Sequence, residues 1–165
     1  MTQASNRITT DYVELHDRLR MAGELPRDGA VIMWLTQRLV RRLVPLLLQW
    51  LDQQAGSVPR RDIVHGFAQQ AARMGMEEHP RVDIARNNAE WLVSRIDYAT
   101  EAGHLVLTMR NDDGYAFGMR LAPMELRQWL TVLHGLWAHA EWPMDIWPDW
   151  LANQTPEERA PPQLH

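Results

Sequence analysis

The segment from His104 to Leu121 constrains the fold of this chain more than any other. Apolar residues alternate with polar or small ones through 104–110 and again through 115–121, and residues 111–114 between them read Asn-Asp-Asp-Gly. That tetrapeptide is a strong hairpin-turn sequence. Because successive side chains of a strand point to opposite faces, the pattern predicts an antiparallel hairpin with one apolar face. Such a face has to be covered by a second layer.

The chain offers a further strand before the hairpin and a covering helix after it. Residues 91–98 predict the preceding strand, joined through the turn at 100–103, although residues 82–98 also fit a helical period. Pro123 starts a helix that we expect to end near Glu141. One half of its helical wheel is apolar: Leu126, Trp129, Leu130, Val132, Leu133, Leu136, Trp137 and Ala140. The sequence thus predicts a three-stranded meander with a long helix packed on it.

The N-terminal half is predicted to be helical. Helices are expected over about 10–21, 30–54 and 57–75, and the second of these has the strongest apolar stripe. Residues 76–90 are weakly patterned and have room for a helical turn after Pro80. The predicted fold class is α+β: N-terminal helices, a three-stranded antiparallel meander and a long C-terminal amphipathic helix. We expect one domain over 1–152 and a flexible polar tail over 153–165, with no internal repeat evident.

The third predicted helix separates its residues by polarity. At about 100° per residue, one face of this helix collects the apolar side chains Ile63, Val64, Phe67, Ala68, Ala71 and Met74. The other side carries Arg61, Asp62, Gln69 and Arg73. Wide apolar faces of this kind are one reason to expect contact with another protein.

Composition and motifs exclude several classes of chemistry. The chain has no cysteine, which excludes disulfides, thiolate metal sites and a cysteine nucleophile. His134 and His139 lie five residues apart on the last predicted helix, so they do not share a face as metal ligands would. We find no nucleophile elbow, phosphate-binding loop or dinucleotide fingerprint. We therefore expect no cofactor and no metal, and the chain leans towards a non-enzyme.

Charge and hydropathy indicate which partners and which cellular location to expect. All 17 basic residues are arginine and the net charge is −4, so nucleic-acid binding over the whole surface is not expected. Three arginines near the middle of 30–54 (Arg38, Arg41 and Arg42) argue against a membrane span. The polar N-terminus does not have the form of a secretory signal, so a cytoplasmic location is the expectation.

Arginines on the outer face of the predicted meander form one candidate binding site. If the strands pair in sequence order, Arg95, Arg110 and Arg120 lie on the same side. They either form an ordinary solvated sheet face or anchor an acidic peptide or a phosphate. Tyr115 and Phe117 point to the opposite face, which weakens the case for base stacking on this sheet.

Tryptophans form the second candidate site. Five of the eight fall in the last 37 residues. Trp129 and Trp137 lie on the apolar stripe of the last helix and are predicted to be in the core. Trp142, Trp147 and Trp150 follow that helix, where they either close a gap in the core or contact a partner.

The function predicted is that of a non-catalytic accessory or adaptor protein that acts through protein–protein interaction as a homodimer. One alternative is a small-ligand-binding protein or enzyme with a pocket between sheet and helices, using His104, Arg110 or Arg120. A further alternative is an arginine-mediated binder of nucleic acid or a membrane surface. The layout resembles that of bacterial secretion chaperones, a likeness of fold that does not establish function.

Overall fold

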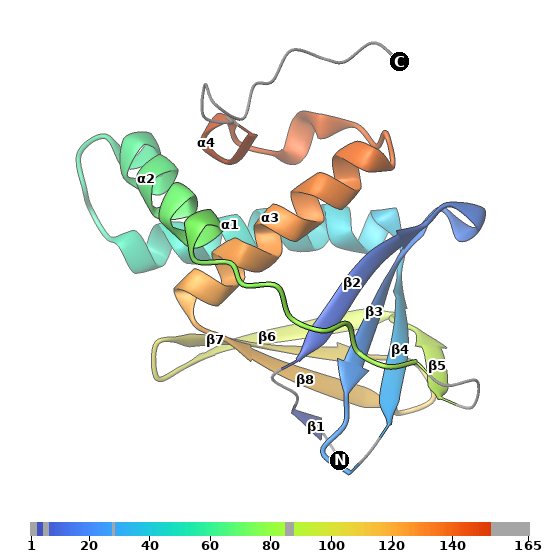
Figure 1. Ribbon diagram of the computed structural model, residues 1–165. Coiled ribbons are helices and arrows are strands. Elements are labelled where there is room, and N and C mark those ends of the chain that lie inside the picture. The colour runs from blue at the N-terminus through green and yellow to red at the C-terminus, as the bar shows by residue number, and fades with distance from the viewer. Residues whose placement is uncertain (1–2, 5–6, 28, 85–87, 153–165) are drawn as a thin grey trace.

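A computed structural model describes residues 3–4, 7–27, 29–84 and 88–152. It has a mixed α+β architecture in which two sheets of four strands each lie beneath a layer of helices (Figure 1). The helices are α1 (Gln37–Ala55), α2 (Arg61–Met74), α3 (Pro123–His139) and α4 (Asp149–Ala152), with 3₁₀ turns η1 (Glu14–His16) and η2 (Met144–Ile146). The predicted α+β class is thus confirmed, and the predicted tail over 153–165 lies outside the described residues.

The first sheet contains the predicted meander. Its strand order is β1 (Gln3–Ala4), β8 (Ala116–Leu121), β7 (His104–Arg110) and β6 (Arg95–Glu101). The three strands β6, β7 and β8 are antiparallel neighbours, as predicted, and β1 adds in parallel beside β8. The β6–β7 turn is formed by Ala102 and Gly103, both with positive φ (49° and 78°), the backbone that a tight two-residue hairpin requires.

The second sheet overturns the prediction of N-terminal helices. It runs β2 (Ile8–Val13), β3 (Arg18–Glu24), β4 (Ala30–Leu35) and β5 (Ala89–Leu92). The predicted helix over 10–21 is therefore wrong, and the helix predicted from residue 30 begins only at Gln37, after a buried strand. Thr36 marks that boundary, because its hydroxyl accepts a hydrogen bond from the Leu39 amide and caps α1. The likeness in layout to secretion chaperones is drawn from helices beside one small sheet, and the second sheet gives it no support.

Residues 82–98, for which helix and strand were both open, contain strands that belong to different sheets. Trp91 lies in β5, which pairs in parallel with β4, whereas Tyr98 lies in β6 beside β7. The single strand predicted over 91–98 is therefore broken at Val93 and Ser94, where the chain passes from one sheet to the other. The described residues after Pro80 contain no helical turn up to residue 84.

The two sheets are built from topologically equivalent halves. In each half an antiparallel meander leads into a long helix: β2-β3-β4-α1 and then β6-β7-β8-α3. Leu19 pairs with Leu35 in the first half, and 86 residues later Leu105 pairs with Leu121 in the second. The short strand before each meander crosses over: β1 joins the second half's sheet and β5 joins the first half's. Each half therefore completes the sheet of the other.

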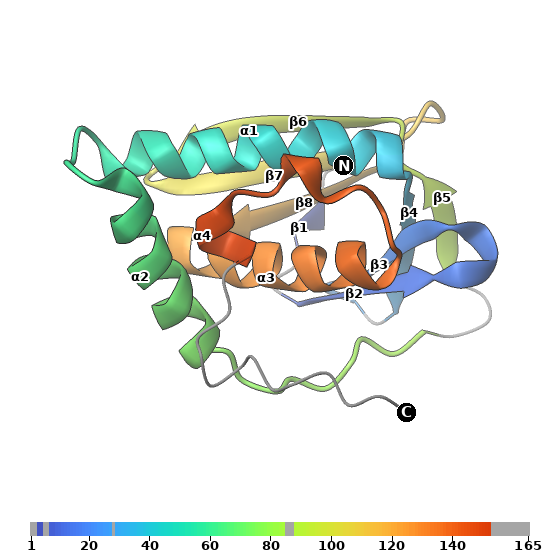
Figure 2. The same cartoon turned by 90° about the horizontal axis from the view of Figure 1, so that it is seen from above.

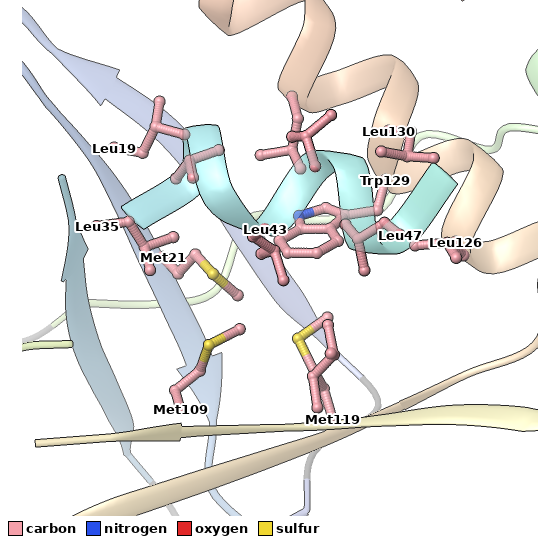
Figure 3. Packing of buried hydrophobic residues seen from close by; sticks show 14 of the residues in the cluster. Leu19, Met21, Leu35, Leu43, Leu47, Met109, Met119, Leu126, Trp129 and Leu130 are labelled. Carbon is pink, nitrogen blue, oxygen red and sulfur yellow. The ribbon is translucent and has the colours of Figure 1, made fainter. Parts of the chain in front are cut away.

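The core lies between the sheets and the long helices. Figure 3 shows Met109 and Met119 of the first sheet facing Trp129 of α3 and Leu43 of α1. Both Trp129 and Trp137 are buried, as predicted. Figure 2 shows α1 and α3 running alongside one another, and Figure 1 shows α4 above them.

One glycine makes close packing between the sheets possible. A Cβ on Gly23 of β3 would lie 2.3 Å from the Cζ atom of Phe117, whose ring is 1% exposed. The aromatic ring of one half thus packs directly on the backbone of the other half.

Candidate protein-interaction surface

Helix α2 exposes its apolar side. Ile63 is 50% exposed, Val64 42%, Phe67 70% and Met74 82%, and Ala71 is exposed beside them. At about 100° per residue, these five residues lie within an arc of roughly 100°. We call them the apolar face of α2. The helix lies at the rim of the helical layer in both views (Figures 1 and 2).

The side of α2 that packs on the protein is polar. His65 and Gln69 are each 1% exposed, and the remaining buried position of the helix is Ala72. The sequence predicted the helix and the grouping of its apolar residues, and both are confirmed. Helix α2 buries its polar side, the reverse of α1, whose buried residues are all apolar. Burial of polar groups with exposure of large apolar ones is the informative departure from ordinary packing.

A hydrogen-bonded cluster holds His65 in place. Its Nε2 lies 2.7 Å from Oδ1 of Asp52 on α1, and its Nδ1 lies 2.8 Å from Nη2 of Arg127 on α3. A guanidinium only donates, so Nδ1 accepts and the ring proton is on Nε2, which donates to Asp52. Burial lowers the pKa of Arg127 below its usual range, and the Asp52 carboxylate acts in the opposite direction. The cluster thus links α2 to two neighbouring helices.

Gln69 extends the cluster one turn along α2. Its Nε2 donates to the Arg127 carbonyl oxygen at 2.7 Å and to Oγ1 of Thr131 at 2.8 Å. Its Oε1 accepts from Nη1 of Arg127 at 3.4 Å. Buried polar groups that are satisfied in this way fix the orientation of a helix, because turning α2 over would leave each of them unpaired.

The C-terminal segment closes over the same cluster. Trp150 stacks on His65 with ring centroids 4.7 Å apart, and Cζ of Arg127 lies 5.6 Å from the Trp150 ring. Arg73 of α2 donates to the Leu151 carbonyl oxygen. Helix α4 therefore covers the polar side of α2 and leaves the apolar face open. These contacts were not predicted, although His65 and Gln69 at a spacing of four residues opposite the apolar stripe are a signal in the sequence.

The C-terminal tryptophans of the candidate site contact the chain itself. Trp142 is 6% exposed and donates from Nε1 to Oδ1 of Asp17 at 2.9 Å. Trp147 is 7% exposed and packs edge-on against Trp137. Of the two uses left open for these rings, such burial favours closure of the core. Their role in partner binding stays a prediction.

The arginines of the outer sheet face are paired with carboxylates. Nε of Arg110 lies 2.6 Å from Asp97, and Nε of Arg95 lies 3.2 Å from the same carboxylate. The hydrogen bond from Arg110 lowers the pKa of Asp97. Arg120 lies 3.7 Å from Glu101. The charges of this face are thus balanced locally, and Phe117 is buried as predicted, whereas Tyr115 is exposed.

Other kinds of site have less support. Across the described residues, no three histidine or acidic side chains are placed to hold a metal ion, and no helix is long and apolar enough to cross a membrane. A polar pocket of about 290 Å³ is lined by Arg7, Glu24, Leu25, Pro26, Gly29, Val82 and Asp83. That lining contains none of the residues of the enzyme hypothesis, His104, Arg110 and Arg120. Comparisons with protein-family models, curated proteins and solved structures find no match.

Proposed function

We propose that this chain is a non-catalytic protein-binding module whose docking surface is the apolar face of α2. The observation that carries the proposal is the reversed amphipathicity of this helix. His65 and Gln69 are buried and hydrogen-bonded, whereas Phe67 and Met74 are 70% and 82% exposed. Contiguous apolar patches on a surface mark interaction sites.

The spacing of the exposed residues fits recognition through a helix face. Ile63, Phe67 and Met74 stand at positions i, i+4 and i+11, the spacing of anchors that enter an apolar groove or pack on another helix. Complete burial of one such side chain contributes about 1.5–3 kcal/mol, so several together supply the centre of an interface. The entropic cost of ordering α2 on binding is small, because hydrogen bonds to α1, α3 and α4 already hold the helix in place.

The contacts of the buried cluster support binding in preference to catalysis. His65 and Arg127 have the residue types of a catalytic site, but they bond to each other and Trp150 stacks over the imidazole. Of the three arginines in the arginine-based alternative, Arg41 is paired with Asp145 at 2.5 Å, and Arg38 and Arg42 are exposed. A cytoplasmic location is part of the proposal and stays a prediction.

Site-specific photocrosslinking in the native cell tests the proposal. Phe67 is replaced by p-benzoylphenylalanine, and the same replacement of Leu15, 90% exposed at a turn, serves as the control. We expect a protein adduct of defined mass from position 67 and none from position 15. The adduct should disappear when Ile63→Ser and Met74→Ser are added to the crosslinking chain. Equal adducts from both positions, or none from position 67, would refute the proposal.

A further inference from the structure

We infer that the partner of the apolar face of α2 is a second copy of this chain, with the two α2 helices packed antiparallel across a two-fold axis. This inference rests on the proposed function and names its partner. It follows from the distribution of charge around the apolar face, which is complementary to itself.

The charges that flank the apolar face differ in sign between the two ends of α2. Arg60 and Arg61 stand at the start of the helix, and Glu77 and Glu78 follow its end; all four are exposed. Asp62 in the first turn and Arg73 in the last turn lie on the other side of the helix, with Gln69. Between the helix end and the glutamates, Met76 is 41% exposed and extends the apolar surface. In an antiparallel pair the basic end of each helix lies against the acidic end of the other. A parallel pair would bring like charges together, which is unfavourable.

The side chains of the apolar face also fit this arrangement. When the two-fold axis crosses α2 at residue 69, near the centre of the helix, Arg61 lies at the end of the interface where Glu77 of the partner subunit follows the partner helix. Phe67 is then level with Ala71 of the partner subunit, and Val64 with Met74 of the partner subunit. A large side chain thus meets a small one near the axis, the pattern by which helices interdigitate. A two-fold axis makes every such contact twice.

Other occupants of this face fit less well. Residues 153–165 contain one large apolar residue, Leu164, and so have few apolar side chains with which to cover the face. The C-terminal helix α4 is already seated on the opposite side of α2. An anionic membrane surface would repel Glu77 and Glu78 at one end of the face.

The size of the interface sets the expected affinity. A helix of 14 residues is about 21 Å long, and one face of it is smaller than the roughly 800 Å² per partner of a standard interface. We therefore expect a dimer that dissociates on dilution, with a dissociation constant of about 1–100 μM.

A charge-exchange experiment by analytical ultracentrifugation tests the pairing. One variant carries Arg60→Glu and Arg61→Glu, and the other carries Glu77→Arg and Glu78→Arg. Each alone places like charges at both ends of the interface, so we expect its dissociation constant to rise at least about 10-fold. In an equimolar mixture each variant meets opposite charges on the other, and association should return to within a few-fold of the original protein.

A matched control separates pairing from net charge. Arg38→Glu with Arg42→Glu makes the same change in charge at two exposed positions of α1. This control should associate as the unaltered chain does. Equal weakening in the control, or failure of the mixture to recover, would overturn the antiparallel pairing.

The two proposals fail in different ways. If the chain is monomeric at all concentrations while position 67 crosslinks to a different protein, self-association is refuted and the docking surface stands. If position 67 yields only an adduct with twice the mass of the chain, both stand. If there is neither an adduct nor a dimer, both are refuted.

Discussion

Two adjacent glutamines on α2 should respond to the same substitution in opposite ways. Gln69 is 1% exposed within the polar cluster, whereas Gln70 is exposed beside the apolar face. Gln69→Leu therefore removes buried hydrogen bonds, and Gln70→Leu enlarges an apolar surface. The pair tests the orientation of the helix directly.

The magnitude for Gln69→Leu follows from its contacts. The substitution removes two hydrogen bonds of 2.7 and 2.8 Å and a longer one of 3.4 Å from the Arg127 guanidinium. Their loss costs about 3–4 kcal/mol. The more apolar leucine returns about 1 kcal/mol, so we expect a net destabilisation of about 2–3 kcal/mol. For a chain of this size the melting temperature should fall by about 5–10 °C.

Gln70→Leu should leave the stability of the monomer within about 0.5 kcal/mol of its original value. On the dimer it adds an apolar contact next to Ile63 and Met74 in each copy. About 0.75 kcal/mol of new burial per copy, made twice across the axis, tightens association about 10-fold. Urea unfolding followed by tryptophan fluorescence at about 0.05 μM protein, below the dissociation constants expected for both chains, measures the first effect. Ultracentrifugation measures the second.

The result that would refute the reasoning is a reversal of the two effects. If Gln70→Leu destabilised the monomer and Gln69→Leu did not, α2 would have its apolar face against the core. A loss of stability in both variants would mean that neither face of the helix is free, and the proposed docking surface would be wrong.

Two further predictions concern the sheets and their turns. Gly23→Ala should destabilise the protein by about 1–3 kcal/mol, because the new Cβ would lie 2.3 Å from the Phe117 ring, and Phe117→Leu in the same chain should recover part of the loss in urea unfolding. Asp17 accepts hydrogen bonds from Tyr12 and Trp142, which lower its pKa from 3.8. Its stabilising effect is therefore complete above about pH 4 and is lost as pH falls through the folded-state value. The difference in melting temperature between the original protein and Asp17→Asn should shrink on acidification, and a constant difference would contradict this.

Strands β7 and β8 and helix α3 could be predicted because their signals are local. The turn at residues 111–114 and the alternation on both sides of it determine β7 and β8 without reference to the rest of the protein. Pro123 and the apolar stripe after it determine α3 in the same way.

The strands of the first half could not be predicted because they lack those signals. The turn between β2 and β3 has no glycine, and Asp17 takes the left-handed conformation (φ 49°) in its place. Leu15, which fits a helical stripe, is 90% exposed at the tip of that turn. Strand β4 is apolar at every position because it is central in its sheet and largely buried, so it shows no alternation and merges with the stripe of α1.

The candidate site could be predicted only in part from the sequence, for a different reason. The sequence identifies the apolar residues of α2, but the direction in which they point depends on bonds from His65 to Arg127, 62 residues away. The repeat of the two halves is likewise only partly visible in residue identity: Leu19 and Leu35 match Leu105 and Leu121, but other related positions differ. Gly23 and Phe117 meet between the sheets, whereas the positions related to them by the 86-residue shift are Met109 and Val31. Positions related by the shift are buried in both halves but carry side chains of different size. Comparison of residue types along the sequence therefore does not reveal the repeat.

The exchange of short strands between the two halves is relevant to the proposed function. The short strands β1 and β5 extend each other's sheets, and α1 and α3 bury their apolar sides in the common core. Within the described residues, the strands and helices of the two halves therefore cover each other's sheet edges and apolar faces inside a single chain. Helix α2 is not one of these elements, and its apolar face contributes no buried residue to the core they share. Packing of the monomer thus gives no reason for Phe67 and Met74 to be apolar, whereas association through α2 does.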